Sequence, residues 1–384
     1  MKLDLRKYRF QDPVYITRPS MPPLSLYTDL LKEIWDSRQL TNSGRFHGEF
    51  EDRVADFMGA EYVCLFCNGT LALQVGLQAL GINDGEAITT PFTFPATVHA
   101  LHWNNIRPVF CDVEPTSFNL DPKLIESLIT PQTRVILPVH VFGTPCDVEA
   151  IDDIARRHNL KVIYDAAHAF GVRYKGRPLV DFGDMSMLSF HATKQFTTAE
   201  GGALVVHTAE QKERINQLKN FGIVGQETVV APGINGKMSE LQAAFGLLAL
   251  DLIEDDVAVR AKLSARYRTE LQDVSGLRFL KPADDVEPND NYFPIFINEE
   301  RFGMNRDVLS DRLIEINVFP RKYFYPLCSD YSCYSSLPSS DPANLPVAHR
   351  AASEVLCLPI YGDLPEETVR IVCEVVRELG AQYA

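Results

Sequence analysis

The 384-residue sequence lacks long hydrophobic runs. No window approaches the roughly eighteen consecutive apolar residues that a membrane-spanning helix needs. The N-terminal stretch MKLDLRKYRFQDPVYITRPSMPPL also lacks the uninterrupted apolar core of a secretory signal peptide. We therefore expect a cytoplasmic protein with no membrane partner.

An excess of positive charge is also missing, because 37 Lys and Arg residues stand against 51 Asp and Glu residues, giving a formal net charge of −14. Nucleic acids and membrane surfaces are themselves anionic, so this balance argues against both as general partners. It does not exclude a small anionic ligand, since the charge of a local pocket can oppose the net charge.

The eight cysteines lack the paired spacing of a zinc site. Cys64 and Cys67 form one CxxC, but neither a second CxxC nor an HxxxH follows it. We therefore expect no bound metal, and we expect the thiols to be reduced and mostly buried.

The sequence does contain enough apolar residues for a large core, since 46% of its residues are hydrophobic. From about residue 60 to 206, the apolar runs EYVCLF, EAITT, RPVFCDV, RVILPVHV and KVIYDA alternate with amphipathic helical patterns. This alternation is typical of βαβ units, in which helices cover both faces of a mostly parallel sheet. The predicted fold class is α/β.

Beyond about residue 209 the pattern becomes mainly helical. The stretch KMSELQAAFGLLALDLIEDDVAVRAKLSARYRTEL is longer than an ordinary helix, so we expect a break near residues 251–256. After it, NYFPIFIN predicts a strand, and RDVLSDRLIEIN and PEETVRIVCEVVRELG predict helices. We therefore divide the chain into a large domain, residues 1–255, and a smaller C-terminal α+β domain, residues 256–384.

Two stretches of the α/β part contain residues suited to ligand binding. Asn68, Gly69 and Thr70 lie at a strand-to-helix junction, where free N–H groups and the helix dipole bind phosphate, although such residues also serve simply as helix caps. Asp165 ends an apolar strand, at the sheet edge where ligands bind, and a buried carboxylate there needs a cation or several donors. A helix cap is an equally compatible role for Asp165.

Lys194 follows the apolar run MSMLSF and precedes EGG. A partly desolvated lysine has a lowered pKa and becomes an amine nucleophile, whereas a surface lysine would only pack its stem on the protein. A phosphate site, a strand-end carboxylate and a lysine are together the groups that pyridoxal phosphate requires. Its phosphate binds a helix N-terminus, its ring nitrogen faces a carboxylate, and its aldehyde forms an imine with a lysine.

The same stretches resemble the DegT/StrS-type sugar aminotransferases, of the aspartate-aminotransferase fold class (fold type I). The resemblance covers nearly the whole chain and rests on FCNGTLAL, TPFTFPATVHAL, ILPVHVFGTPCDVEAI, VIYDAAHAFG, LSFHATKQFTTAEGGA and INGKMSELQAA. It implies a large domain that binds pyridoxal phosphate, with pyridoxamine phosphate as the intermediate form of the cofactor, and a smaller C-terminal domain.

The resemblance also implies a role for each matching residue. Lys194 matches the lysine that binds the cofactor and then carries protons, Asp165 the partner of the ring nitrogen, and His168 the position near the phenolic oxygen. The remaining matches are phosphate contacts, an aromatic that stacks on the ring, and an asparagine that reaches the phosphate across a homodimer interface. The phosphate contacts are Gly69, Thr70 and Ser189. The stacking aromatic is Phe94, and the asparagine at the interface is Asn235.

The chain departs from the commonest form of the family in small ways. Ala199 stands where Gly is frequent, and Gln195 follows the lysine where Asn is frequent. Neither change removes a donor that the chemistry requires. One branch of the family removes a sugar hydroxyl and carries His in place of the lysine, and Lys194 argues against that branch.

The stretches FHATK, VVAPGINGKMSE and FPRKYFYPL look most like the branch that aminates C4 of dTDP-4-keto-6-deoxyglucose. That resemblance implies L-glutamate as donor, 2-oxoglutarate as its product, and an amino sugar for O-antigen, another surface polysaccharide or a natural product. Arg321 and Tyr323 match a segment near the sugar nucleotide, although a packed arginine and a core tyrosine are equally compatible. The alternatives are amination of C3 of a dTDP-sugar, amination of C4 of a UDP-sugar, and a regulatory protein that retains the cofactor fold without turnover.

Overall fold

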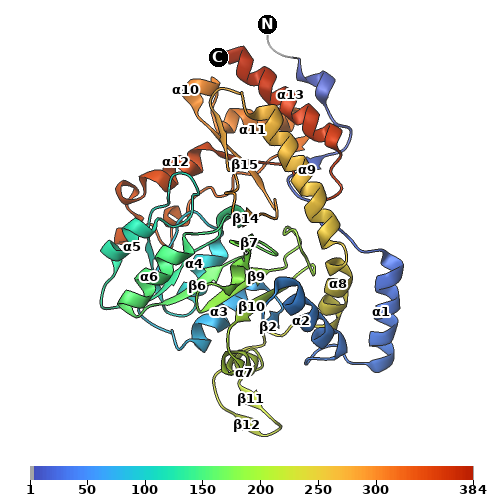
Figure 1. Cartoon of the computed structure of the whole chain (residues 1–384), viewed down its shortest axis with the longest axis vertical. Coiled ribbons are helices and arrows are strands. Elements are labelled where there is room, and N and C mark those ends of the chain that lie inside the picture. Colours follow the sequence, from blue (N-terminus) through green and yellow to red (C-terminus); the bar gives the residue numbers. More distant parts are fainter. Residues whose placement is uncertain (1–3, 384) are drawn as a thin grey trace.

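The computed structural model describes residues 4–383 and arranges them in two packed units (Figure 1). The large unit is a seven-stranded sheet between helices, and the C-terminal unit is built on a three-stranded sheet. The first and last residues that the structure describes both lie at the C-terminal unit (Figure 1). This arrangement agrees with a large and a smaller domain, while the residue boundaries at 255 and 256 stay a prediction.

The central sheet has the strand order β2-β10-β9-β6-β5-β3-β4. Only β10 runs antiparallel to its neighbours, β2 and β9, so the sheet is mostly parallel, as the alternating pattern predicted. The strands are β2 (Tyr62–Phe66), β3 (Glu86–Thr89), β4 (Arg107–Phe110), β5 (Thr133–Leu137), β6 (Lys161–Asp165), β9 (Met185–Ser189) and β10 (Gly202–Val206).

Each face of the central sheet belongs to a different core. In β2, Val63 and Leu65 pack on one face, whereas Cys64 and Phe66 pack on the other. Successive side chains of a strand point to opposite faces, so a strand covered on both sides is apolar throughout. The covering helices are α2 (Arg45–Met58), α5 (Pro122–Leu128), α6 (Val148–His158) and α8 (Glu240–Leu250) on the first face, and α3 (Gly69–Ala79), α4 (Pro95–His102) and α7 (Ala209–Leu218) on the second.

The N-terminus of α2 is capped by a side chain from α8. Gly44 precedes α2 and offers no capping group, but the buried Glu240 carboxylate accepts hydrogen bonds from the N–H groups of Phe46 (2.8 Å) and His47 (3.2 Å). The first N–H groups of a helix have no partner within it, so Glu240 satisfies two of them and fixes α2 to α8.

The long helical stretch breaks where the sequence predicted. α8 ends at Leu250, and α9 (Ile253–Leu271) begins after Asp251 and Leu252. Helix α8 packs on the central sheet, whereas α9 packs on the C-terminal helix α13 (Glu366–Tyr383). The break is therefore the point at which the chain leaves the large unit.

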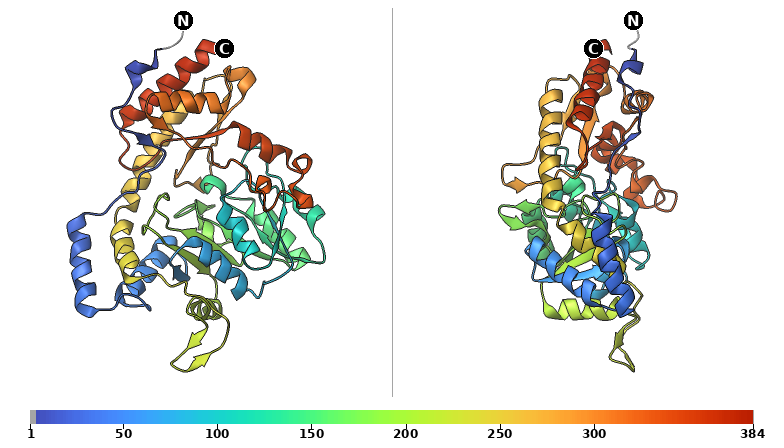
Figure 2. Two further views of the ribbon diagram at one scale, coloured as in Figure 1. Left: turned by 180° about the vertical axis from the view of Figure 1, so that it is seen from behind. Right: turned by 90° about the vertical axis from the view of Figure 1, so that its right-hand side faces the viewer.

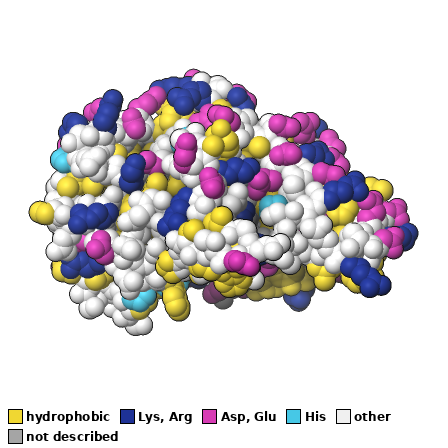
Figure 3. Space-filling view, turned by 90° about the horizontal axis from the view of Figure 1, so that it is seen from below, with side chains coloured by type: hydrophobic (Ala, Val, Ile, Leu, Met, Phe, Trp, Pro, Cys, Tyr) yellow, Lys and Arg dark blue, Asp and Glu magenta, His cyan; other side chains and the backbone are white. Residues whose placement is uncertain are grey.

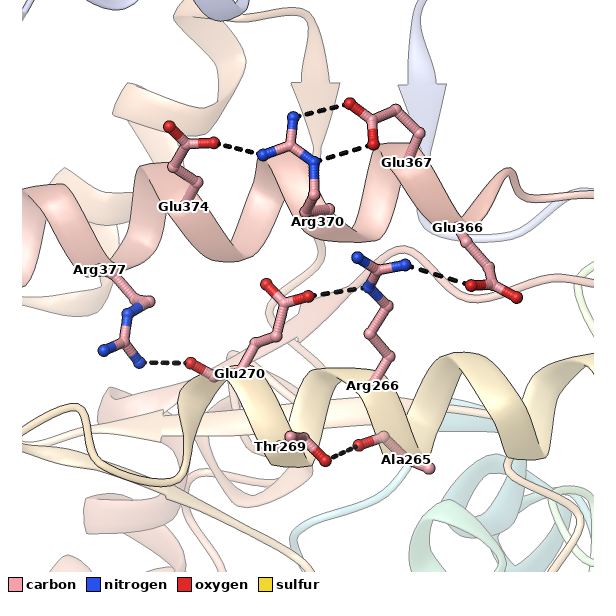
Figure 4. A network of polar contacts seen from close by, with 9 residues as sticks. All are labelled: Ala265, Arg266, Thr269, Glu270, Glu366, Glu367, Arg370, Glu374 and Arg377. Carbon is pink, nitrogen blue, oxygen red and sulfur yellow. Dashed lines mark hydrogen bonds and ion pairs between the residues drawn. The ribbon is translucent and has the colours of Figure 1, made fainter.

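The C-terminal unit packs α9 beside α13 on its own sheet. At the surface Arg266 contacts Glu270 (2.8 Å) and Glu366 (3.1 Å), and Arg377 donates to the carbonyl of Glu270 (Figure 4). Exposed ion pairs stabilise a fold only weakly, so the apolar core beneath them supplies most of the stability. The other elements are β13 (Leu277–Phe279), β15 (Phe293–Ile297), β17 (Val355–Leu358), α10 (Glu299–Phe302), α11 (Arg306–Glu315) and α12 (Pro346–Glu354).

A fourth core joins the two units. Phe110 and Phe118 of the large unit pack in it with Phe296 and Ala348 of the C-terminal unit, and the rings of Phe118 and Phe296 are stacked 4.1 Å apart. Two short pairings add to this junction: β1 (Val14–Tyr15) with β16 (Val318–Phe319), and β7 (Arg173–Tyr174), itself paired with β8 (Arg177–Pro178), with β14 (Val286–Glu287).

The N-terminal segment, residues 14–20, runs along the same junction. The carbonyl of Ile16 accepts a hydrogen bond from the N–H of Ile360 in the C-terminal unit (3.0 Å). The hydroxyl of Thr17 donates to the carbonyl of Thr193 in the large unit (3.5 Å). The segment therefore contacts both units.

Two parts of the chain project from the body: helix α1 (Leu24–Ser37) at one edge, and a hairpin beyond α7 (Figure 1, Figure 2). The hairpin, β11 (Ile223–Val224) and β12 (Thr228–Val229), lies in the glycine-bearing segment after α7 and was not predicted. Hydrophobic side chains form patches among charged ones on the face seen from this end (Figure 3). Within residues 4–383, none of the helices combines the length and apolar character of a membrane span.

Candidate active site

Nine of the eleven predicted site residues line one cavity of about 240 Å³. They come from strand ends, loops and the first turn of α3 in the large unit, and from the C-terminal part: Asn68, Gly69, Thr70, Phe94, Asp165, His168, Ser189, Lys194 and Tyr323. A larger cleft of about 780 Å³ between the two units contains none of the predicted residues, so its volume does not identify the site. The smaller cavity is the candidate site because it contains these residues.

The N-terminus of α3 lies in the cavity wall, where its N–H groups form a candidate anion site. The Asn68 side chain accepts a hydrogen bond from the N–H of Leu71 (2.9 Å), which confirms its reading as a helix cap. The N–H groups of Gly69 and Thr70, in the first turn, have no acceptor within the helix and lie in the cavity wall. One residue caps the helix and the next two offer donors to an anion.

Two glycines keep this anion site accessible. A Cβ on Gly69 would lie 2.9 Å from the sulfur of Met187, and a Cβ on Gly202 would lie 2.6 Å from the backbone nitrogen of Gly69. Gly202 therefore needs glycine, because its Cβ would meet backbone, whereas a Cβ on Gly69 would require the Met187 side chain to shift.

Lys194 lies in a tight loop between β9 and β10. The carbonyl of Phe190 accepts hydrogen bonds from the N–H of Thr198 and the hydroxyl of Thr197, both at 3.0 Å, which closes the loop. Burial lowers the pKa of the Lys194 ammonium group from 10.5 to about 8, although the Asp165 carboxylate opposes this shift. Roughly a tenth of the amine is therefore a free base at pH 7, far more than for an ordinary exposed lysine.

Asp165 ends β6 and is buried. One carboxylate oxygen accepts from the hydroxyl of Thr97 (2.7 Å) and the other from the N–H of Ala167 (3.0 Å). Thr93 is hydrogen-bonded to Thr97 (2.9 Å). Burial raises the pKa of Asp165, against the opposing effects of Thr97, Ala167 and Lys194.

The surroundings of Asp165 fit a cationic ligand. Within residues 4–383, none of the ion pairs closer than 4.0 Å includes this carboxylate, although it is 4% exposed. A cationic ring nitrogen at this position would provide the missing opposite charge and favour the ionised carboxylate. With the anion site at α3 and the amine of Lys194, the cavity has the three groups that pyridoxal phosphate requires.

His168 presents a single, defined nitrogen to the cavity. The N–H of Phe142 donates to its Nδ1 (3.1 Å), so Nδ1 is the acceptor and Nε2 carries the proton. Burial lowers the pKa of the imidazole well below its usual value, so the ring is neutral. The ring stacks on Phe324 with an interplanar angle of 1°. His168 is thus a fixed neutral donor.

Phe94, Ser189 and Tyr323 lie at the cavity wall. The Phe94 side chain is 56% exposed in one chain, and Ser189 is the last residue of β9. The ring of Tyr323 packs edge-to-face against the ring of Tyr292, with the ring centroids 5.8 Å apart. Stacking by Phe94, phosphate binding by Ser189 and sugar binding by Tyr323 stay predictions.

Asn235 and Arg321 do not line the cavity within one chain. Asn235 is exposed and forms an isolated β-bridge with Asn220 near the hairpin. Arg321 is exposed, and its backbone pairs with Cys357. Their predicted contacts with phosphate and sugar nucleotide stay predictions.

The structure adds lining residues that the sequence did not reveal. Thr93 shares the cavity wall with the predicted residues and lies just before α4, whereas Thr97 lies behind the wall in the first turn of α4. Because Thr93 precedes the helix, their spacing of four residues is not a helical period, and no periodic signal identified either residue. Tyr292 and Phe324 come from the C-terminal part, and no local pattern marks them.

The cysteines and acidic groups show no metal centre. Within residues 4–383, no three His, Cys, Asp or Glu side chains are grouped to hold a metal ion. All eight cysteines are free thiols; Cys64 is buried and Cys67 is partly buried. Six of the eight are buried, in line with the expectation of mostly buried cysteines.

Known proteins resemble the chain over almost its whole length. A model of the DegT/DnrJ/EryC1/StrS aminotransferase family matches residues 26–377. The chain is 44% identical over 369 residues to a dTDP-4-amino-4,6-dideoxy-D-glucose transaminase of Shigella dysenteriae, covering 96% of this chain and all of the relative. It is 46% identical over 357 residues to the Escherichia coli transaminase of the same name, covering 92% and 95%.

Solved structures give the same result. DesI, crystallised in the presence of its TDP-sugar product, matches with a TM-score of 0.92 at 35% identity, covering 97% of this chain and 94% of that one. This likeness confirms the fold class predicted from the sequence.

Proposed function

Because the chain belongs to the DegT/DnrJ/EryC1/StrS aminotransferase family, we propose that it transfers an amino group from L-glutamate to C4 of dTDP-4-keto-6-deoxyglucose. The observation that carries the proposal is the single cavity containing Lys194, Asp165 and the first turn of α3. The two transaminases 44% and 46% identical to this chain support the choice of sugar and ring position. The product would serve surface-polysaccharide synthesis, such as O-antigen, or natural-product sugars.

Pyridoxal phosphate is the cofactor that these residues would hold. Its phosphate would accept from the N–H groups of Gly69 and Thr70, its ring nitrogen would face Asp165, and its phenolic oxygen would accept from His168 Nε2. When bound, the cofactor supplies an aldehyde that combines with amines and a ring that withdraws electrons from the carbon bearing the amino group.

The amine of Lys194 is the group that moves protons in this proposal. Since burial lowers its pKa to about 8, Nζ accepts a proton from the α-carbon of glutamate and later donates one to the sugar carbon. Asp165 remains ionised beside a cation, and His168 remains neutral, so neither competes for that proton. The Tyr292 and Phe324 rings limit water on one side of the cavity.

The active site would be completed by a second copy of the chain. Asn235 is exposed beside a hairpin whose apolar side chains have no cover in one chain: Val229 is 67% exposed and Val230 is 50% exposed. Exposed apolar groups of this kind mark association surfaces. A homodimer in which Asn235 reaches the partner's phosphate site would cover them.

The eight free thiols support a cytoplasmic location, since reduced cysteines are typical of that compartment. Arg321 and Tyr323 are the proposed contacts for the sugar nucleotide. Amination of C3 of a dTDP-sugar and of C4 of a UDP-sugar are the two competing assignments.

Absorbance and product analysis test the proposal together. The protein loaded with pyridoxal phosphate should be yellow and should bleach on addition of L-glutamate, whereas Lys194→Ala should not complete repeated turnovers. The exposed Lys123→Ala is the matched control and should behave as the wild type.

Incubation with glutamate and dTDP- or UDP-linked 3-keto and 4-keto sugars, followed by mass spectrometry and NMR, identifies the acceptor. A C4 amine on the dTDP-sugar is expected. An aminated C3, or a UDP-linked product, would replace the assigned substrate, and repeated turnover by Lys194→Ala would overturn the mechanism.

A further inference from the structure

Asn289 of the C-terminal unit reaches into the loops that carry the proposed cofactor residues. Its side chain is 3% exposed and lies just before β15. Its Nδ2 donates to the carbonyl of His168 (2.9 Å) and to the carbonyl of Phe170 (3.0 Å). One amide therefore holds the loop that follows Asp165.

Gly143, which has a positive φ of 80°, packs directly against the hydrogen bond between Asn289 and His168. A Cβ on Gly143 would lie 2.8 Å from the carbonyl oxygen of His168 and 3.0 Å from Oδ1 of Asn289. Asn289 also accepts from the N–H of Asn291 through Oδ1 (3.2 Å). Its orientation is thus fixed by donors, acceptors and packing together.

The backbone of the same residue contacts the lysine loop. The Nε2 of Gln195, the neighbour of Lys194, donates to the carbonyl of Asn289 (3.0 Å). Gln195 is 3% exposed, and its Oε1 is buried without a hydrogen-bond partner among residues 4–383. Burying an unsatisfied acceptor is unfavourable, so the bond to Asn289 is the contact that explains an amide at this position.

Helix α9 of the C-terminal unit holds the two residues that follow Asn289, namely Asp290 and Asn291. Arg268 of α9 contacts Asp290 (3.2 Å), and Arg260 of α9 donates to the carbonyl of Asn291 (3.4 Å). The position of Asn289 therefore depends on the C-terminal unit, although both loops that it contacts belong to the large unit.

We propose that Asn289 is a positioning residue that sets the distance between the Lys194 loop and the Asp165–His168 loop. It touches neither the cofactor nor the substrate and acts through the carbonyl of His168 and the amide of Gln195. The inference rests on the proposed cofactor site. It adds that the C-terminal unit determines the geometry of that site through one buried amide.

The test uses Asn289→Asp in the holoenzyme. A carboxylate has nearly the same shape but cannot donate to the two carbonyl groups. Asn104→Asp is the matched control, because Asn104 is also buried, donates to two carbonyl groups (Ala100 and Gln74) and lies outside the cavity. Gln195→Met removes only the hydrogen bond from Gln195 to the carbonyl of Asn289. It is the alternative variant if Asn289→Asp does not fold.

The measurements are the visible spectrum of the loaded protein at a series of pH values, together with kcat and KM for glutamate. Displacement of a reacting group by about 1 Å lowers rates by up to ~100-fold, so we expect Asn289→Asp to lower kcat by at least ~10-fold. KM should change by less than about threefold, because groups that bind substrate are retained. The pH at which the absorbance changes should shift by about 0.5 unit or more.

Asn104→Asp should lower the unfolding temperature without moving the spectrum or its pH dependence. Equal spectral shifts in both aspartate variants, or wild-type kcat and spectrum in a folded Asn289→Asp or Gln195→Met, would overturn the positioning role. A wild-type protein that never becomes yellow with pyridoxal phosphate would instead overturn the proposed function, and this inference with it.

Discussion

At the scale of single residues, the proposed chemistry depends on opposing influences on Lys194. Burial lowers the pKa of its ammonium group, and the nearby Asp165 carboxylate raises it. The result, about 8, leaves the amine available near neutral pH without removing its ability to hold a proton. Neither influence alone would have this effect.

Chemical labelling tests the state of Lys194 in the cofactor-free chain. The free amine is the reactive form and predominates above the pKa, so labelling by a brief pulse of an acylating reagent should rise with pH. It should reach half its maximum near pH 8, whereas an ordinary exposed lysine does so near pH 10.4. Peptide mass spectrometry measures each site, and Asp165→Asn should move the Lys194 midpoint to lower pH. A midpoint equal to that of exposed lysines contradicts the assignment.

A second residue-scale prediction concerns Thr97, whose hydroxyl donates to Asp165. Thr97→Val preserves the shape but removes this donor, which should raise the pKa of Asp165 further and weaken its contact with a cationic ring. A hydrogen bond to a charged group contributes about 1.5 kcal/mol, so cofactor affinity should fall roughly tenfold. Fluorescence titration with pyridoxal phosphate measures it. Thr97→Ser should restore the affinity, and equal affinities for the Val and Ser variants would exclude this role.

At the scale of elements, the sequence predicted those helices and strands whose apolar residues form a local pattern, either a continuous run or a fixed spacing. The strand β2 was found as a short continuous apolar run, and the helix α9 was found because its apolar residues recur at helical spacing. The hairpin β11–β12 was missed, since strands of two residues carry no period.

Contacts between distant elements could not be predicted in this way. Thr97 lies 68 positions from Asp165, and Asn289 lies 121 positions from His168. Both are ordinary polar residues by composition, and only tertiary packing gives them a partner. Lys194 and Asp165 were recognised because their surroundings match a known family, whereas these supporting groups have no such signature.

The capping of α2 by Glu240 gives a prediction for an element. Glu240→Ala leaves two N–H groups of the first turn without an acceptor, so the free energy of unfolding should fall by about 3 kcal/mol. Urea denaturation measures it. Glu49→Ala, which removes only an exposed pair with Arg45 in the same helix, should cost less than about 1 kcal/mol. Similar losses in both variants would contradict the capping role.

At the scale of the whole molecule, the two units pack against each other around the candidate site. The shared core of Phe110, Phe118 and Phe296 holds them together, while Tyr292 and Phe324 of the C-terminal part complete the cavity. The exposed apolar side chains near the hairpin remain to be covered, which is the basis of the proposed dimer.

Mixing of inactive subunits tests that dimer. Lys194→Ala and Asn235→Ala should each be impaired alone, but in a mixed dimer one of the two sites has both residues intact. After unfolding and refolding together in equal amounts, about a quarter of the wild-type activity should return. Steady-state assays measure the recovery. If Asn235 served its own chain, mixing would restore nothing.

The N-terminal segment has a consequence for any shortened or fused form of the protein. Thr17 donates to the carbonyl beside Lys194 from 176 positions away, and Ile16 joins the same segment to the opposite unit. A tag or deletion that displaces residues 14–20 from the junction of the two units would remove the hydrogen bond from Thr17 and loosen the loop that carries Lys194. Residues near the N-terminus are usually the first to be removed when a protein is shortened. In this protein, residues 14–20 support the loop of the reactive amine and should be kept.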